Sequence, residues 1–86
     1  MNTAEIQSEV VSALTEIAPE VVPAELESSA ALRDQVDLDS MDWLNFLIEL
    51  SRRFGVEIPE SEYASMRTID NIVDFLASTV AVADRN

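Results

Sequence analysis

The sequence predicts an all-α domain, a four-helix bundle with a short third helix and a long first loop. Three observations lead to this prediction. Apolar residues recur at helical spacing along the chain, the alternation typical of half-buried strands is absent, and the only glycine stands where the best-marked segment ends. With 86 residues, no repeats and no low-complexity segments, the chain has room for one small core, so we expect residues 1–86 to form a single domain.

An apolar stripe predicts the first helix. Its members are spaced three or four residues apart, as one face of a helix requires: Ile6, Val10, Leu14 and Ile17. Asn2 or Thr3 can cap this helix, and Pro19 and Pro23 stop it. The connection then continues to about Asp39. We expect three apolar residues to pack it against the core, namely Leu26, Leu32 and Val36.

The second helix has the most clearly marked ends. Asp39 is its predicted N-cap, Ser40 its first residue, and Asp42 stands at the third position in a capping-box-like arrangement. The helix extends to Phe54, and Gly55 is well placed to end it in a left-handed turn.

Two further helices complete the bundle. A short third helix is predicted from Glu60 to Met66, after Pro59, and Thr68 caps a fourth. The apolar stripe of the fourth helix consists of Ile69, Ile72, Val73, Leu76 and Val80.

The second helix is apolar over an arc of roughly 220°, which is wider than one helix of a small bundle easily buries. Its predicted core side consists of Trp43, Phe46, Leu47, Leu50 and Phe54. The opposite edge carries Met41, Leu44 and Ile48, beside Asn45 and Arg52. Two interpretations stay open for this edge: the long loop covers it, or it is an exposed rim, bordered by Asp42, Asn45 and Glu49, at which a partner docks.

Composition excludes several classes of function. The chain has 17 acidic residues, five arginines, no lysine and a formal net charge of −12, so nucleic acid and anionic membranes are poor partners and basic protein patches are good ones. It lacks histidine and cysteine, and with them Ser-His and Cys-His pairs, disulfides and ordinary zinc sites. We therefore expect no enzyme and no metal site. The start has no signal-peptide pattern and no segment could span a bilayer, which predicts a cytoplasmic protein.

Several segments together resemble one family. Asp39-Ser40-Met41-Asp42, opening an apolar helix after a long loop, is similar to the Asp-Ser-Leu-Asp signature of acyl carrier proteins. The segments Phe54–Pro59 and Thr68–Leu76 resemble the parts of that family that follow the second helix and form the fourth. The resemblance covers roughly the last fifty residues in the correct order.

This resemblance implies a carrier, not a catalyst. Ser40, flanked by Asp39, Met41 and Asp42, would receive 4′-phosphopantetheine from coenzyme A through a separate phosphopantetheinyl transferase, and would carry acyl groups as thioesters for fatty-acid, polyketide or related lipid biosynthesis. Acyl-loading, condensing and acyl-transfer enzymes with basic patches would dock on Met41, Asp42, Leu44, Asn45, Ile48, Glu49 and Arg52. An acyl chain would be sheltered by Phe46, Leu50, Tyr63, Met66 and Ile69, although ordinary core filling explains Tyr63 and Met66 equally well. The chain starts with methionine and stops just past the fourth helix, which favours a stand-alone carrier and leaves an excised domain as the alternative. We also expect a monomer.

The sequence departs from the family pattern in three places. Asp37 stands where a glycine is usual and is expected to tolerate a left-handed backbone. Trp43 is bulkier than expected. Arg52 and Arg53 replace part of an acidic run, either to complement the helix dipole or to change the choice of partner.

Other interpretations of the motif remain. Asp-Ser alone is a common capping pair. An aminoacyl or peptidyl carrier and an unmodified helical interaction module are the alternative functions. A calcium loop at Asp37, Asp39 and Asp42 is rejected, because the central glycine is missing and Ile48 occupies the position of the glutamate ligand.

Overall fold

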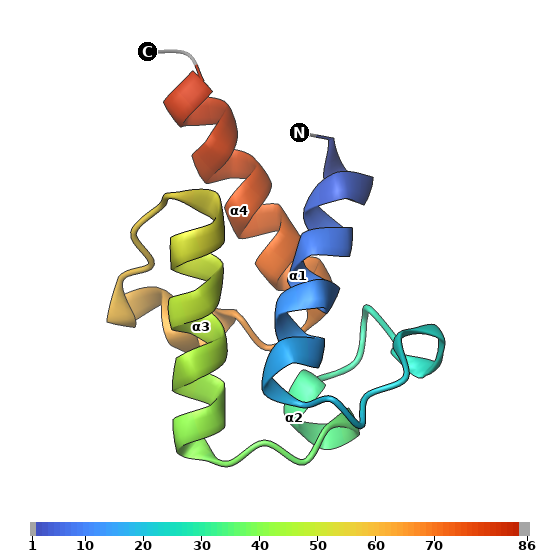
Figure 1. Cartoon of the computed structure of the whole chain (residues 1–86). Coiled ribbons are helices and arrows are strands. Elements are labelled where there is room, and N and C mark those ends of the chain that lie inside the picture. The colour runs from blue at the N-terminus through green and yellow to red at the C-terminus, as the bar shows by residue number, and fades with distance from the viewer. Residues whose placement is uncertain (1, 85–86) are drawn as a thin grey trace.

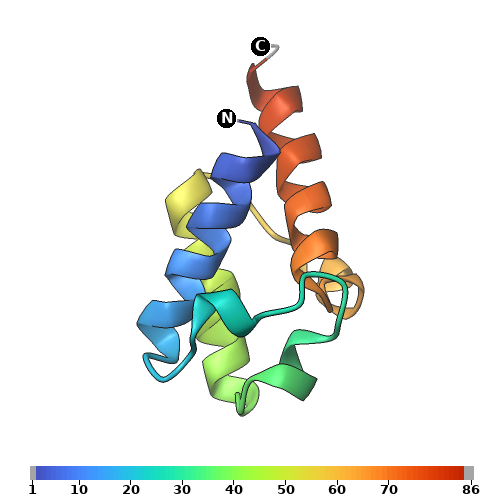
Figure 2. The same ribbon diagram turned by 90° about the vertical axis from the view of Figure 1, so that its right-hand side faces the viewer.

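Three long helices carry the fold of the chain, which we analysed as a computed structural model that describes residues 2–84 and the side chains of 2–80. They are α1 (Thr3–Ile17), α3 (Ser40–Phe54) and α4 (Ile69–Asp84). The first connection contains a 3₁₀ turn, η1 (Pro23–Glu25), and a one-turn helix, α2 (Leu32–Gln35), and a second 3₁₀ segment, η2 (Glu60–Ser65), precedes α4. Figures 1 and 2 show this arrangement, with α1 lying alongside both α3 and α4. None of the described helices combines the length and the apolar character that crossing a bilayer requires.

Local signals in the sequence set the helix ends, as predicted. Asn2 caps α1 with a full capping box, in which its side chain accepts from the Glu5 amide at 2.9 Å and the Glu5 carboxylate accepts from the Asn2 amide at 3.1 Å. Asp39 caps α3, and Gly55 ends it with φ of 62° in the left-handed region. In the described structure the Asp39 cap lacks the reciprocal bond from Asp42, so it is a simple cap and not a box.

The third helix differs in kind from the prediction. It is a 3₁₀ segment that ends at Ser65, one residue before the expected end, with bonds such as Glu62 N–H to the Pro59 carbonyl at 2.9 Å. Short 3₁₀ runs are common connectors of this type between longer helices. Thr68 caps α4 as predicted, since its hydroxyl accepts from the Asn71 amide at 3.0 Å.

The core lies where the three long helices meet. Every fully buried side chain among the described residues is apolar. The largest come from all three helices and include Ile6, Val10, Leu14, Phe46, Leu47, Leu50, Ile69, Ile72 and Leu76. The predicted core side of α3 is thus confirmed at its centre, while Trp43 and Phe54 are half-buried at its margins.

The long first loop is held down by specific bonds. The Leu32 amide donates to the Arg67 carbonyl at 2.9 Å, and the Asp70 amide donates to the Ser28 carbonyl at 3.0 Å. Leu32 and Val36 are buried, as predicted, and Leu26 is half-buried. The loop is therefore tied to the start of α4.

Candidate functional site

The first turn of α3 presents Ser40 to solvent. The preceding segment is extended, and its residues alternate: Val36 and Leu38 are buried, whereas Asp37 and Asp39 are exposed. The two buried side chains anchor the segment, so that Ser40 follows directly on a fixed point of the core. Ser40 itself is exposed.

Asp39 fixes the conformation of this turn. Its carboxylate accepts from the Asp42 amide at 2.8 Å, and its carbonyl accepts the first helical bond, from the Trp43 amide at 2.9 Å. The free amide groups of a helix N-terminus attract an anion, so a phosphate ester on Ser40 fits this position. The carboxylates of Asp39 and Asp42 oppose that attraction with like charge.

The prediction for Asp37 was wrong in its geometry. Among the described residues only Gly55 has a positive φ, so Asp37 does not adopt the left-handed conformation. Burial of the residues on either side of it holds the segment extended, and no tight turn is needed before Asp39.

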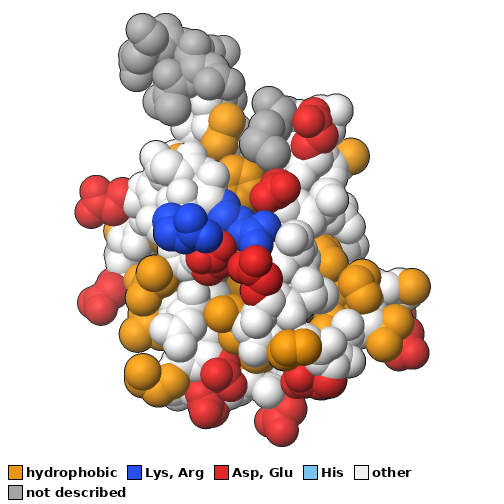
Figure 3. Space-filling view, viewed as in Figure 1, with side chains coloured by type: hydrophobic (Ala, Val, Ile, Leu, Met, Phe, Trp, Pro, Cys, Tyr) orange, Lys and Arg blue, Asp and Glu red, His pale blue; other side chains and the backbone are white. Residues whose placement is uncertain are grey.

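The outer side of α3 carries exposed apolar side chains. Met41 is 64% exposed, Ile48 54% and Leu44 37%, so the interpretation that the long loop covers this edge is wrong. Asn45 beside them is exposed too, and Asp42 is half-buried. Figure 3 shows hydrophobic side chains along this side of α3, with acidic side chains toward its beginning and arginines toward its end. The loop packs instead against α4 and leaves the edge open.

At the end of α3, Glu49 lies beneath two arginines. Arg52 donates to both its carboxylate oxygens, at 3.0 and 2.7 Å, and Arg53 Nε donates to Glu49 Oε2 at 2.8 Å. These hydrogen bonds, the one from Arg52 first, lower the pKa of Glu49 from 4.5 to about 2. Because the Glu49 side chain is only 16% exposed, it does not offer a free carboxylate at the surface.

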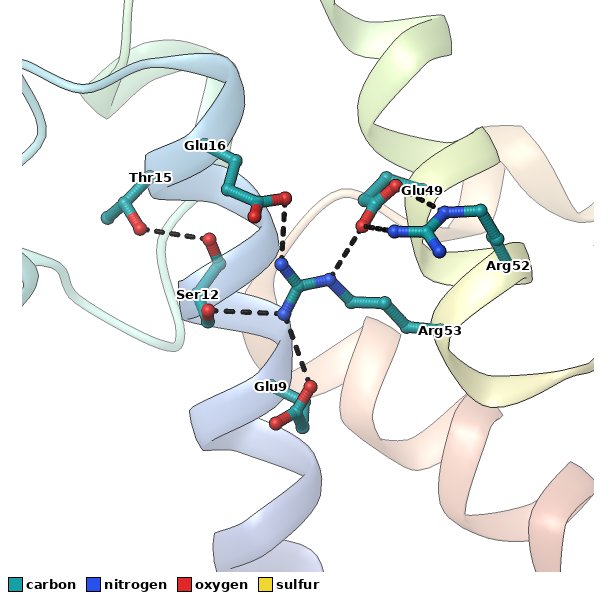
Figure 4. Close-up of polar contacts among 7 residues, drawn as sticks. All are labelled: Glu9, Ser12, Thr15, Glu16, Glu49, Arg52 and Arg53. Carbon is teal, nitrogen blue, oxygen red and sulfur yellow. Dashed lines mark hydrogen bonds and ion pairs between the residues drawn. The ribbon is translucent and has the colours of Figure 1, made fainter.

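Arg53 also links α3 to α1, a contact that the sequence analysis did not anticipate. Its Nη2 lies 2.7 Å from Glu16 Oε2, and its Nη1 lies 3.2 Å from Glu9 Oε2 and 3.1 Å from Ser12 Oγ (Figure 4). Bonds with Glu49 and then Glu16 raise the pKa of Arg53. Glu9 and Glu16 are seven residues apart and so share a face of α1, which was the one available signal.

The residues predicted to shelter an acyl chain lie in or beside the closed core. Phe46, Leu50, Met66 and Ile69 are buried, and Tyr63 is half-buried against them. Two surface hollows formed by the described residues lie elsewhere. One, of about 300 Å³, is lined by Val21, Val22, Leu26, Val36 and polar neighbours on the first loop; the other lies on the outer side of α1.

Comparisons with known proteins agree on one family. Residues 8–76 match the family model described as "Phosphopantetheine attachment site". The chain is 34% identical over 74 residues to an acyl carrier protein of Renibacterium salmoninarum, and the aligned region covers 86% of each chain. It is 32% identical to an acyl carrier protein of Thermosynechococcus vestitus, covering 94% of this chain and 99% of the relative. It is 29% identical to a meromycolate extension acyl carrier protein of Mycolicibacterium aurum, covering 81% and 75%.

The fold has a counterpart among solved structures. An acyl carrier protein from Enterococcus faecalis superposes with a TM-score of 0.76, covering 92% of this chain and 99% of the other at 22% sequence identity. This likeness supports the predicted bundle architecture.

Proposed function

The chain belongs to the acyl carrier protein family, whose members bear covalent 4′-phosphopantetheine, and from this premise we propose that Ser40 is the attachment site. The observation that carries the proposal is the exposed hydroxyl of Ser40 on the first turn of α3, within the matched region and fixed by the Asp39 cap. The family consists of carriers, and we propose that this chain likewise catalyses no reaction and works in the cytoplasm.

Ser40 provides the nucleophilic oxygen of the attachment step. Its Oγ forms a bond to the phosphorus that bears the pantetheine half of coenzyme A, the pyrophosphate link breaks, and the nucleotide half leaves. The chain has no histidine that could take the Ser40 proton, so a separate transferase supplies the base. Once attached, the group supplies a thiol that holds an acyl chain as a thioester.

The surface of α3 is the proposed docking site for the transferase and for acyl-handling enzymes. Weak docking on an exposed apolar rim lets one carrier visit several enzymes in turn, and the tether raises the concentration of the acyl group at each active site. The rim is formed by Met41, Leu44 and Ile48, with the polar residues Asp42, Asn45, Glu49 and Arg52 around it.

A sheltered acyl chain requires the helices to part. Phe46, Leu50, Met66 and Ile69 are buried, so the space for an apolar chain has to be opened, and we propose that displacement of Tyr63 and of η2 opens it. Because η2 is a short 3₁₀ segment with little burial of its own, its displacement costs less than that of a long helix.

Intact mass spectrometry tests the attachment. After incubation with coenzyme A, magnesium and a broad-specificity phosphopantetheinyl transferase, we expect the chain to gain one phosphopantetheine. Ser40→Ala abolishes the gain, whereas Ser61→Ala, which removes another exposed hydroxyl beside acidic residues, leaves it intact. No gain in the wild type, with this transferase or the host's own, contradicts the proposal and favours an unmodified interaction module.

The two carboxylates of the motif are proposed to be read by the transferase. Asp39→Asn keeps the capping oxygen but removes the charge, so helix stability stays and modification slows. Unchanged modification kinetics in this variant would show that the charge of Asp39 is not recognised.

A further inference from the structure

The exposed side of α3 forms one continuous stripe that ends in a cation. Met41, Leu44, Ile48 and Arg52 follow one another at spacings of three, four and four residues, which places them along a single side of the helix. The stripe extends for about 16 Å at 1.5 Å per residue. It faces away from the core that Phe46 and Leu50 enter.

Arg52 and Arg53 are neighbours in sequence but differ in accessibility. The Arg52 side chain is 72% exposed, whereas that of Arg53 is 16% exposed and is bound to carboxylates on two helices. The carboxylate of Glu49 beneath them is also only 16% exposed. The exposed charge at this end of α3 is therefore the guanidinium of Arg52, which is bound on one side to Glu49. The other accessible carboxylates nearby, those of Glu9 and Glu16, belong to α1 and are paired with Arg53.

The charge at the other end is opposite. Asp39 is exposed and Asp42 half-buried beside Ser40, and among the described residues no arginine pairs with either. The charge therefore changes sign from one end of the stripe to the other: carboxylates lie at the Ser40 end, apolar side chains in the middle and a cation at the far end.

We propose that this stripe docks an acyl-handling enzyme whose patch carries a basic group near the entrance for the arm, an apolar seat, and a carboxylate opposite Arg52. The inference rests on the proposed function and adds to it the charge order of the partner. A uniformly basic patch, to which the net charge of −12 would otherwise attract the chain, meets Arg52 with like charge. The opposite charges also fix the direction in which the stripe lies on the enzyme, with Ser40 at the active-site entrance.

The test uses the phosphopantetheine-loaded carrier and a condensing enzyme of known structure whose docking patch is uniformly basic. We expect Arg52→Glu to raise kcat/KM of this enzyme roughly 3- to 10-fold and Arg52→Gln to raise it less. Both increases in kcat/KM should become smaller at high salt. Arg67→Glu is the matched control, because it changes the net charge equally at an exposed arginine outside α3, and it should have less than half that effect.

A reverse change on the enzyme completes the test. Replacement of the basic residue opposite Arg52 by glutamate should raise the rate with the wild-type carrier and lower it with Arg52→Glu. Rates for Arg52→Glu that match the wild type or the Arg67→Glu control overturn the inference. Intact mass recorded before each assay separates the two failures: an unmodified chain defeats the proposed function, and a modified chain that is insensitive to Arg52 defeats only the charge order.

Discussion

The two ends of α3 are stabilised by different kinds of interaction. At the beginning, one local hydrogen bond from the Asp42 amide to Asp39 closes the turn and leaves the Ser40 hydroxyl free. At the end, Arg53 is bound by carboxylates from α1 and α3 together, and Arg52 covers Glu49. The arrangement at the beginning depends on residues within one helical turn, whereas the arrangement at the end depends on how α1 and α3 pack together. The difference is consistent with the proposal that the first end is the modification site, and it shows that the second end links α3 to α1.

The two largest expected effects on stability come from the two ends of α3, and loss of the Asp39 cap is one of them. Asp39→Ala removes the acceptor of the Asp42 amide and should cost about 1 kcal/mol, lowering Tm by roughly 4–8 °C. Asp39→Asn retains an acceptor oxygen and should stay within about 0.5 kcal/mol of the wild type. Thermal unfolding followed by circular dichroism measures both. Equal losses in the two variants would mean that charge, not capping, holds this end.

Gly55 tests the other end of α3 through its backbone. Gly55→Ala places a side chain at φ of 62°, where no neighbouring atom lies within 4 Å of the new Cβ, so only the conformational cost remains. We expect a loss of roughly 1–2 kcal/mol in chemical denaturation, with an unchanged m-value. An unaffected midpoint would show that the end of α3 does not depend on the left-handed turn.

Substitution of Arg53 should destabilise the protein more than substitution of Arg52. Arg53→Met removes the contacts of α3 with Glu9 and Glu16 and should lower Tm by roughly 2–5 °C. Arg52→Met should lower it less, since Arg52 contacts only its own helix. The difference in Tm between the two variants should become smaller in high salt. If Arg52→Met is the more harmful change, the division between the two arginines is wrong.

The smallest effect is the pH dependence that Glu49 contributes. Its folded-state pKa of about 2 lies below its ordinary value of 4.5, so its stabilising contribution is present above pH 4.5 and is lost as pH falls toward 2. The Tm difference between wild type and Glu49→Gln should therefore close over that range. A difference that persists unchanged to pH 2 would contradict the ion-paired arrangement.

Sequence reasoning succeeded where the signals are local. The cap at Asp39, the left-handed turn at Gly55 and the start of α4 at Thr68 each depend on residues within one turn, and all three were predicted correctly. The one-turn helix α2 was not predicted, because it is held by a distant partner, the Arg67 carbonyl that accepts from the Leu32 amide.

The same limit applies to the candidate site. The apolar edge of α3 was visible in the sequence, but its exposure depends on where the long loop packs, and that follows from the Ser28–Asp70 bond to α4. Likewise the sequence does not show that Arg52 and Arg53 have different roles. Only the packing of α1 against α3 brings Glu9 and Glu16 to Arg53 and gives that arginine a structural role.

Localisation of the attached group within the chain tests the account most directly. Trypsin cleavage after Arg33 and Arg52 releases residues 34–52 of the loaded carrier, which contain two serines, Ser40 and Ser51, and fragmentation distinguishes them because ten residues lie between. Since Ser51 bonds its hydroxyl to the Val56 carbonyl at the end of α3, it is a control on the same peptide. We predict that the added mass lies on Ser40 alone. A modified Ser51, or a loaded chain whose 34–52 peptide is unmodified, would contradict the assignment of the open first turn of α3 as the attachment site.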